Sequence, residues 1–345
     1  MHKRGVKMGK KTLMLLISIM VIIIAGCEGG SSSGSGTTTK TGGSTKAFVG
    51  GTVGLEAKFL SGAPPDEVND QDFPFDINII IENQGEYDVS KNKTTLEITG
   101  IHPPDFGKTQ EQLRVNSAPE DLFGAKKDSQ GNTIAGASVI FDTFSDLEFQ
   151  KPISGSPKFI IRANLCYTYG TNAIAQVCVL EDLTGRTRKT GELPLCEPTN
   201  NNIEVENSGA PVHVDNFAQT VTGKDKISFS FNIKHKGEKE NRVAERGSEC
   251  SSEVAKKDKI FVTVDTGLAG LKCSGLSSGT VNDEDGVEEG YVKLFGESAG
   301  TEERAVFCSQ PLPAERTDFQ KQVKITIEYD YRQHIDKELT VKHIE

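Results

Sequence analysis

The chain has 345 residues, a formal net charge of −10 and no Trp, and its 35 Gly accompany short runs rich in Val, Ile, Thr and Phe. A chain of this length can bury the cores of two domains, and this composition favours β structure. The first 26 residues hold five Lys/Arg and no acidic residue, which leaves 34 basic against 49 acidic residues and a net charge of about −15 beyond them. So acidic a body disfavours nucleic acid and anionic lipid as partners.

The amino terminus has the layout of a secretory signal peptide. A basic segment precedes the apolar run 13–25, which is short for a membrane span. Residues 24–27 (IAGC) resemble a lipobox, in which small residues let the processing enzymes reach the Cys that receives the lipid. We therefore expect a signal peptide over 1–26, lipidation at Cys27 and a Gly/Ser/Thr tether over 27–47. An uncleaved anchor helix and cleavage at another position are the alternatives.

One strand pattern occurs twice. Every second residue is apolar in Phe75, Ile77, Ile79 and Ile81, as in a half-buried strand, and a turn follows at Gly85. About 150 residues later the same alternation precedes a second Gly-Glu pair, in Ile227, Phe229, Phe231, Ile233 and Gly237. The two copies predict two domains built on one plan.

The remaining elements of the first copy follow in chain order. Further strands are expected over 53–60, 94–98 and 137–149, and 101–127 reads as a long loop with a helical turn. The copy is expected to close with a hairpin, 158–169 and 173–180, that turns at Gly170-Thr171-Asn172.

The second copy repeats this order. Gly209-Ala210-Pro211 matches Gly62-Ala63-Pro64, and Tyr329-x-Tyr331 matches Tyr167-x-Tyr169. Its other expected strands are 227–234, 259–264 and 292–295, with a closing hairpin of 323–331 and 338–344. The sequence thus predicts an all-β fold of two tandem immunoglobulin-like β-sandwich domains, 48–184 and 203–345, joined by the connection 185–202.

Six cysteines remain besides Cys27, an even number that suits disulfide bonding in an exported chain. They are Cys166, Cys178, Cys196, Cys250, Cys273 and Cys308. One pairing joins Cys178 to Cys196 and Cys273 to Cys308, which leaves Cys166–Cys250 to join the domains. Cys166–Cys178, across the expected closing hairpin, is the alternative.

Candidate ligand and modification sites are few. The acidic runs 66–72 and 282–289 are candidates for calcium, the second through Asp283, Asp285 and Glu288 around the turn at Gly286. The spacing of an EF-hand loop is not met, so a solvated hairpin tip is the favoured interpretation. Asn92 lies in the one Asn-x-Ser/Thr sequon and is a candidate for glycosylation.

No motif for catalysis or for a cofactor stands out. The histidines lie outside HExxH-type and nucleophile motifs, and no phosphate loop or dinucleotide fingerprint occurs. His102, beside the acidic Asp105, is expected to be a loop residue. We expect no cofactor and no enzymatic activity.

The chain resembles a family of uncharacterised archaeal surface lipoproteins with tandem immunoglobulin-like domains of the CARDB or S-layer type. The shared features are GAPP at 62–65, FPF at 73–75, the Tyr-x-Tyr segment 167–179 and GAPV at 209–212. These motifs are structural, so the resemblance implies a fold and a location and transfers no active site.

The expected function follows from these features. The chain is predicted to be a lipid-anchored protein on the extracytoplasmic face of the cell membrane, with a non-catalytic role in binding, adhesion or envelope assembly. Its partner would be an envelope or cell-surface protein or a glycan. A calcium- or glycan-binding module is the alternative, and an envelope-processing enzyme is a third hypothesis.

Overall fold

The computed structural model describes residues 46–70, 73–187, 191, 193–279, 281–282, 285–295 and 302–343. The predicted signal peptide, Cys27 and most of the tether lie outside these ranges. Thr45–Glu345 forms one compact unit. Within the described ranges, no helix combines the length and the apolar character needed to traverse a bilayer.

Strands dominate the described chain, with three short 3-10 helices, η1 (Lys91–Lys93), η2 (Pro103–Phe106) and η3 (Glu111–Leu113). The strands are β1 (Leu55–Phe59), β2 (Glu67–Asn69), β3 (Phe75–Asn83), β4 (Thr94–Thr99), β5 (Arg114–Val115), β6 (Lys126–Lys127), β7 (Thr133–Ile134), β8 (Ser138–Leu147), β9 (Lys158–Val179), β10 (Asn200–Ile203), β11 (Glu206–Asn207), β12 (Val212–Gly223), β13 (Lys226–His235), β14 (Arg242–Ala244), β15 (Lys259–Asp265), β16 (Lys272–Ser274), β17 (Val281–Asn282), β18 (Val287–Lys293), β19 (Glu303–Pro311) and β20 (Phe319–Lys342).

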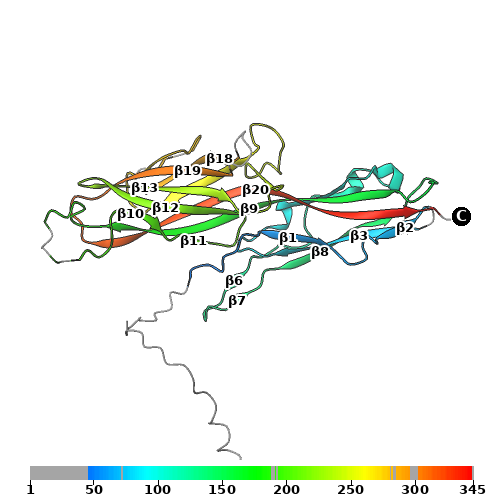
Figure 1. Ribbon diagram of the computed structural model, residues 1–345, viewed down its shortest axis with the longest axis horizontal. Helices are drawn as coiled ribbons and strands as arrows, with labels where there is room; N and C mark the ends of the chain where they lie inside the picture. Colours follow the sequence, from blue (N-terminus) through cyan, green and yellow to red (C-terminus); the bar gives the residue numbers. More distant parts are fainter. Residues whose placement is uncertain are drawn as a thin grey trace, which may run out of the picture. The chain divides into compact units, whose positions relative to one another are not determined.

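Two long antiparallel strands, β9 and β20, run side by side through the whole body (Figure 1). Around them a single sheet has the order β17-β18-β15-β20-β9-β4-β5. One half of this sheet packs against the sheet β1-β3-β8 and the other against the sheet β10-β12-β13-β19-β16, which gives two sandwiches. We call them the first and the second sandwich. The fold is therefore an all-β sandwich fold, as the sequence predicted, and strand pairing continues from one sandwich into the other.

Both predicted closing hairpins are wrong, because each is one uninterrupted strand. Gly170 was expected in a turn, but it lies beneath the ring of Tyr87, where an added Cβ would come within 2.5 Å of that ring. In β20 the polar stretch that suggested a turn forms an extended, half-exposed part of the strand. The register between β9 and β20 has no bulge from Thr340↔Lys158 to Phe319↔Val179.

The alternating pattern of the two repeated strands is confirmed. In β3 the side chains of Phe75, Ile77, Ile79 and Ile81 are buried, and in β13 so are those of Ile227, Phe229, Phe231 and Ile233. Each strand is the middle strand of the smaller sheet in its sandwich, with neighbours β1 and β8 or β12 and β19. Burial of these rows against the long sheet supplies the core of each sandwich.

The repeated strands pair in equivalent registers in the two sandwiches, in keeping with a duplication. Leu55 pairs with Asn83 as Val212 pairs with His235, so β1 corresponds to β12 and β3 to β13. When β1 is aligned with β12 and β3 with β13, the predicted match of Gly62-Ala63-Pro64 to Gly209-Ala210-Pro211 is wrong. The first motif follows β1, whereas the second immediately precedes β12.

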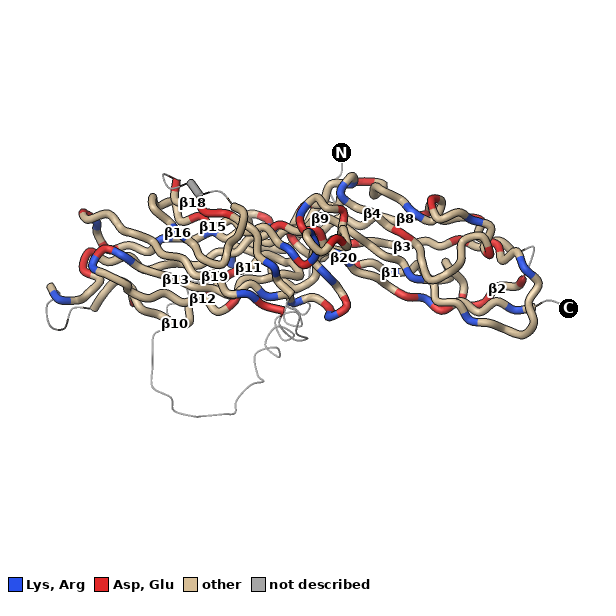
Figure 2. Tube along the Cα trace, turned by 90° about the horizontal axis from the view of Figure 1, so that it is seen from above, with Lys and Arg blue, Asp and Glu red and all other residues tan. Residues whose placement is uncertain are grey.

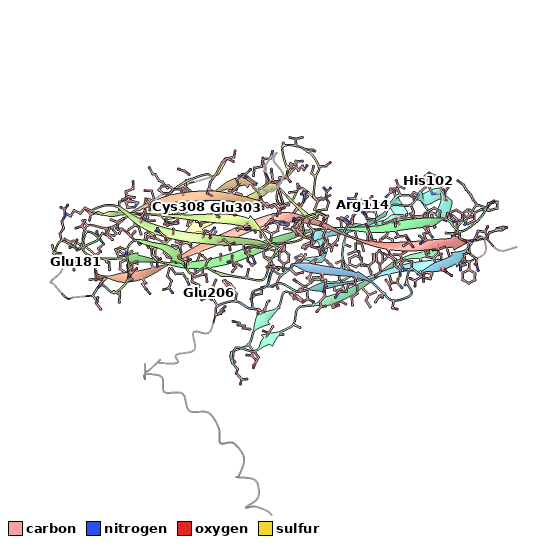
Figure 3. All side chains as sticks on the ribbon, in the orientation of Figure 1. His102, Arg114, Glu181, Glu206, Glu303 and Cys308 are labelled. Atoms are coloured by element: carbon pink, nitrogen blue, oxygen red, sulfur yellow. A yellow bond between two sulfur atoms is a disulfide. The ribbon has the colours of Figure 1, made fainter. Side chains whose placement is uncertain are left out.

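Three disulfide bonds join Cys166 to Cys250, Cys178 to Cys196, and Cys273 to Cys308. These are the pairs of the first predicted scheme. The alternative Cys166–Cys178 is wrong because both residues lie on the continuous strand β9. Cys308 on β19 faces Cys273 across the β16–β19 pair (Figure 3).

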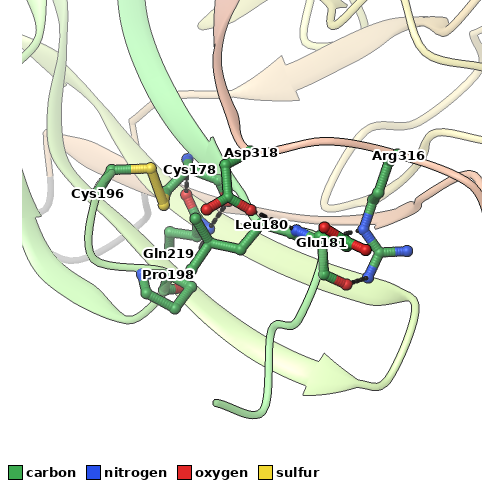
Figure 4. The surroundings of a disulfide bond; sticks show 8 residues. All are labelled: Cys178, Leu180, Glu181, Cys196, Pro198, Gln219, Arg316 and Asp318. Carbon is green, nitrogen blue, oxygen red and sulfur yellow. Dashed lines mark hydrogen bonds between the residues drawn. A yellow bond between two sulfur atoms is a disulfide. The ribbon is translucent and has the colours of Figure 1, made fainter. Parts of the chain in front are cut away.

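The Cys178–Cys196 bond holds the connection between the two copies against β9 (Figure 4). Beside it the buried Gln219 accepts a hydrogen bond from the Cys178 N–H (2.7 Å) and donates to the carbonyls of Cys178 (2.8 Å) and Pro198 (3.0 Å). This connection therefore closes one side of the second sandwich.

Candidate functional site

Four tyrosines form a buried block where the two sandwiches meet. On the paired strands Tyr169 lies opposite Tyr329, and Tyr167 lies opposite Tyr331. All four are at most 1% exposed. Burial raises the pKa of each phenol, so the hydroxyls stay neutral hydrogen-bonding groups.

Two of the hydroxyls make equivalent contacts in the two sandwiches. Tyr169 donates to Asn83 Oδ1 (3.0 Å), and Tyr331 shares a hydrogen bond with His235 Nε2 (2.9 Å). A Cβ on Gly85 or on Gly237 would lie 2.1 Å from the corresponding tyrosine oxygen. The glycine after each repeated strand is thus required by the close approach of a tyrosine hydroxyl.

The other two hydroxyls reach the first residue of β1 or the start of β12. Tyr167 Oη accepts from the Leu55 N–H (3.1 Å) and donates to Gln333 Oε1 (3.3 Å), while Gln333 Nε2 donates to the Leu55 carbonyl (2.8 Å). In the second sandwich Tyr329 contacts the Thr171 hydroxyl (3.5 Å), which donates to the Val212 carbonyl (2.6 Å). The block therefore positions the start of both strands.

The segment that leads from the tether into β1 crosses this junction. The N–H groups of Val49 and Gly50 donate to the Glu86 carboxylate (2.9 Å each), which also accepts the N–H of Gly209 (2.7 Å). The Ala47 N–H donates to the carboxylate of Glu206 on β11 (2.5 Å; Figure 3). The Glu86 carboxylate thus joins backbone N–H groups from both copies.

In the second sandwich the outer edge of β9 is covered by the chain itself. The strand β11 pairs antiparallel with β9, and Ser208 N–H donates to the Asn172 carbonyl (2.8 Å) while Asn172 N–H donates to Ser208 Oγ (2.9 Å). The side-chain amide of Asn207 spans to β12, accepting from the Val214 N–H (2.8 Å) and donating to its carbonyl (3.0 Å). The short segment 206–208 thus hydrogen-bonds the backbone at the edges of both β9 and β12.

In the first sandwich the corresponding place is a groove of about 360 Å³, which we call the edge groove. It lies between β1 and β20, and the loop after β13 forms its mouth. Its lining residues are Thr52–Ala57, Pro211, Lys236–Glu238, Asn241, Tyr331 and Gln333–Ile335. The edge groove is the candidate binding site, because it exposes backbone that the second sandwich covers.

Figure 2 shows basic and acidic residues mixed over both sandwiches, and charges of both signs also surround the edge groove. Lys236 forms an ion pair with Asp215 (2.6 Å), and Glu238 is exposed beside it. Behind the mouth, burial lowers the pKa of His235, with the Glu302 carboxylate 3.9 Å from its Nδ1 opposing this. The groove therefore gathers no strong charge of one sign that would select an acidic or a basic ligand.

The predicted calcium residues are not gathered into a site in the described chain. Asp283 lies outside the described residues. Glu288 is largely buried, and its carboxylate accepts the N–H of Cys273. Among the described residues, no three His, Cys, Asp or Glu side chains are placed to hold a metal ion together.

The other acidic run contributes to contacts with the end of β20. Asp66 pairs with Lys337 and Glu67 with Lys342, and Asp70 is within 2.7 Å of His343 Nδ1. His102 on the first sandwich lies at a loop with its Nδ1 3.1 Å from Asp105, as expected (Figure 3). The Asp105 pKa is lowered by hydrogen bonds from Lys151 and then His102.

Asn92 in the sequon is exposed and lies in η1, so a glycan there would have room; its occupancy stays a prediction. The residues of the edge groove and Glu86 belong to the candidate site but were not predicted from the sequence. A signal was present in the Gly-Glu pairs at 85–86 and 237–238, since each glycine lies against a tyrosine of the Tyr-x-Tyr motifs.

Comparison with known proteins adds no family. No protein-family model and no curated protein sequence matches the chain. Among solved structures, it is similar to the Mu homology domain of Fcho1 from Danio rerio with a bound Eps15 peptide, at 8% identity and TM-score 0.23, over 54% of this chain and 88% of that one. It is also similar to the secreted serine protease VesC from Vibrio cholerae, at 12% identity and TM-score 0.16, over 85% of this chain and 52% of that one. Neither likeness bears on function.

Proposed function

We propose that the chain is a lipid-anchored surface protein whose sandwich body is a non-catalytic binding module for another component of the cell envelope. The observation that carries this proposal is the edge groove, where two strand edges lie open beside a buried and rigidly bonded tyrosine block. An exposed strand edge is a template for pairing with another chain. A fold that leaves one edge open and covers its counterpart has a place for a partner.

The compartment is supported by the cysteines and by the amino terminus. All six cysteines of the body are paired, and such pairing persists in oxidising surroundings outside the cytoplasm. The lipobox-like residues 24–27 and the tether support a body on the outer side of a membrane, as in the archaeal surface lipoproteins that the chain resembles.

The way the tether enters the body suits display. Residues 47–50 are bonded at the junction by Glu206 and Glu86, so the chain enters the body between the sandwiches rather than at the far loops of either one. The bonds to Glu86 are partly buried, whereas the bond to Glu206 is exposed.

Crosslinking in intact cells tests the binding role. A photoreactive amino acid replaces Glu238 at the mouth of the edge groove in the full chain, and a matched variant carries it at the exposed Lys272 on β16. We expect a discrete covalent adduct with an envelope protein from position 238 and none from position 272. Adducts from neither position, or equally from both, would contradict the proposal.

The mass of the membrane-extracted chain tests the anchor. We expect a chain that begins at lipid-bearing Cys27 and gains the mass of six hydrogens on reduction. A chain that retains residues 1–26 would exclude lipid anchoring at Cys27.

A further inference from the structure

We propose that the edge groove binds one extended peptide segment of another exported protein, which adds a short antiparallel strand to β20 at His334 and Asp336 and bonds the edge of β1 at Ala57. The inference rests on the proposed binding function and specifies its chemistry, which is recognition by strand addition.

The edge of β20 is open along this stretch. Neighbouring residues of a strand alternate in the direction of their backbone groups. Asn172, opposite Thr326, bonds Ser208 on the side away from β20, so even-numbered residues of β9 and β20 point away from each other. The N–H of Thr340 follows this rule and donates outward to the Asp66 carbonyl (2.9 Å).

His334, Asp336 and Glu338 therefore direct their N–H and C=O groups to the outer edge. On that edge β14 pairs with Arg332 and β2 begins at Thr340. Between them, none of the described residues donates to or accepts from these backbone groups.

The facing edge of β1 is open as well. Leu55 directs its N–H and C=O outward to Tyr167 and Gln333, and the same alternation turns those of Ala57 outward too. No side chain in the described part of the molecule bonds the Ala57 backbone, although that residue is only 7% exposed. Ala57 is a lining residue of the edge groove.

The second sandwich shows what fits such a place. The symmetric register makes His334 the counterpart of Asn172, Asp336 of Ile174, and Ala57 of Val214. At those counterparts the occupant is an extended segment that pairs through Glu206 and Ser208 and uses the amide of Asn207 to bond Val214. The matching ligand is an extended peptide with an Asn between the two residues that pair with β20.

The chain's own preceding segment does not take this place. Asn207 lies five residues before Val212, and the residue five before Leu55 is Gly50. Gly50 is instead bound by Glu86 at the junction, with its neighbour Gly51 accepting the N–H of Ala210 (3.1 Å). The position equivalent to β11 thus stays open to a segment from outside.

The probe is the acetylated hexapeptide IEVENS, which copies residues 203–208, added to the full-length oxidised protein. Backbone amide hydrogen exchange is measured for His334, Asp336 and Ala57 without and with peptide. We expect these amides to exchange freely at first and to slow at least tenfold at saturating peptide, while those of Ile174 and Val214 stay unchanged.

Peptide variants leave the protein untouched and identify the contacts. N-methylation at the position of Glu206 removes a donor that faces β20 and should weaken binding about tenfold, the effect of one backbone hydrogen bond. N-methylation at the position of Val205 faces away and should leave affinity within about twofold. Asn207→Ala in the peptide should cost about tenfold through the loss of its bonds to Ala57.

Three results would overturn the inference. They are no protection at millimolar peptide, equal loss from both N-methylated peptides, and groove amides already protected in the free chain, which would indicate the chain's own tether or a second copy as occupant. If crosslinking at position 238 gives adducts in cells but the peptide protects no groove amide from exchange, strand addition is overturned. The proposed binding function would still stand.

Discussion

The two sandwiches share one plan but differ at one edge, and the difference is where we place the binding site. In the second sandwich the connection between the copies is held to β9 by the Cys178–Cys196 bond, and the segment that follows it covers the edges of β9 and β12 through β11 and Asn207. In the first sandwich the corresponding edges of β20 and β1 line a groove. A duplication creates two equivalent edges but only one connection to cover them.

Removal of the disulfide that closes the second sandwich should have the largest effect. The double variant Cys178→Ser, Cys196→Ser frees a loop of 18 residues, and we expect the free energy of unfolding to fall by about 3 kcal/mol. Denaturant unfolding measures the loss, and amide hydrogen exchange at positions 178 and 219 should speed up at lower denaturant than exchange in the first sandwich. An unchanged stability would show that the connection is not what closes this side.

The side chain of Asn207 should make a measurable contribution to covering the edge of β12. Asn207→Ala leaves the backbone groups of Val214 without their partner, and we expect a loss of about 1–2 kcal/mol. The exposed Asn202→Ala is the control and should change stability by less than about 0.5 kcal/mol. Equal effects of the two variants would contradict the role given to Asn207.

Acid should weaken the second sandwich more than the first. Burial lowers the pKa of His235 below its ordinary 6.5, so the unfolded chain binds a proton first, and stability falls as the pH drops below about 6.5. Its counterpart Asn83 does not titrate. We expect His235→Asn to flatten the dependence of unfolding free energy on pH between 7 and 5. An equally steep decline in the unaltered protein and in the variant would assign the acid sensitivity to another group. His213 is one such group, because burial lowers its pKa as well.

The smallest effect should come from the exposed ion pair beside the edge groove. Arg162 donates to both carboxylate oxygens of Asp336 (2.8 Å each), but both side chains are well exposed. Asp336→Asn should therefore cost less than about 0.5 kcal/mol and leave peptide binding through its backbone intact. A large loss of peptide affinity would show that this side chain, rather than the strand edge, is recognised.

Local patterns were enough to predict part of this structure. The alternating rows of β3 and β13, and the even number of cysteines, depend on features that the sequence displays directly. β12 and β19 were not predicted. In β12 the pattern is interrupted by a register shift between Asp215 and Ala218, with a positive φ of 53° at Asn216.

The hairpins and the groove depended on contacts between distant residues. Gly170 reads as a turn until Tyr87 is known to lie over it, and Gln333 reads as part of a turn until its amide is seen bonding Leu55. The open edge arises from the register of β9 with β20, strands that are far apart in the sequence. No local pattern could have indicated which edge the connection would cover.

Hydrogen exchange in the free, full-length protein tests the difference between the sandwiches most directly. We expect the amides of Ala57, His334 and Asp336 to exchange much faster than those of their counterparts Val214, Asn172 and Ile174. Comparable protection in the two sets would mean that the first sandwich is closed as well, and there would be no open edge for a partner.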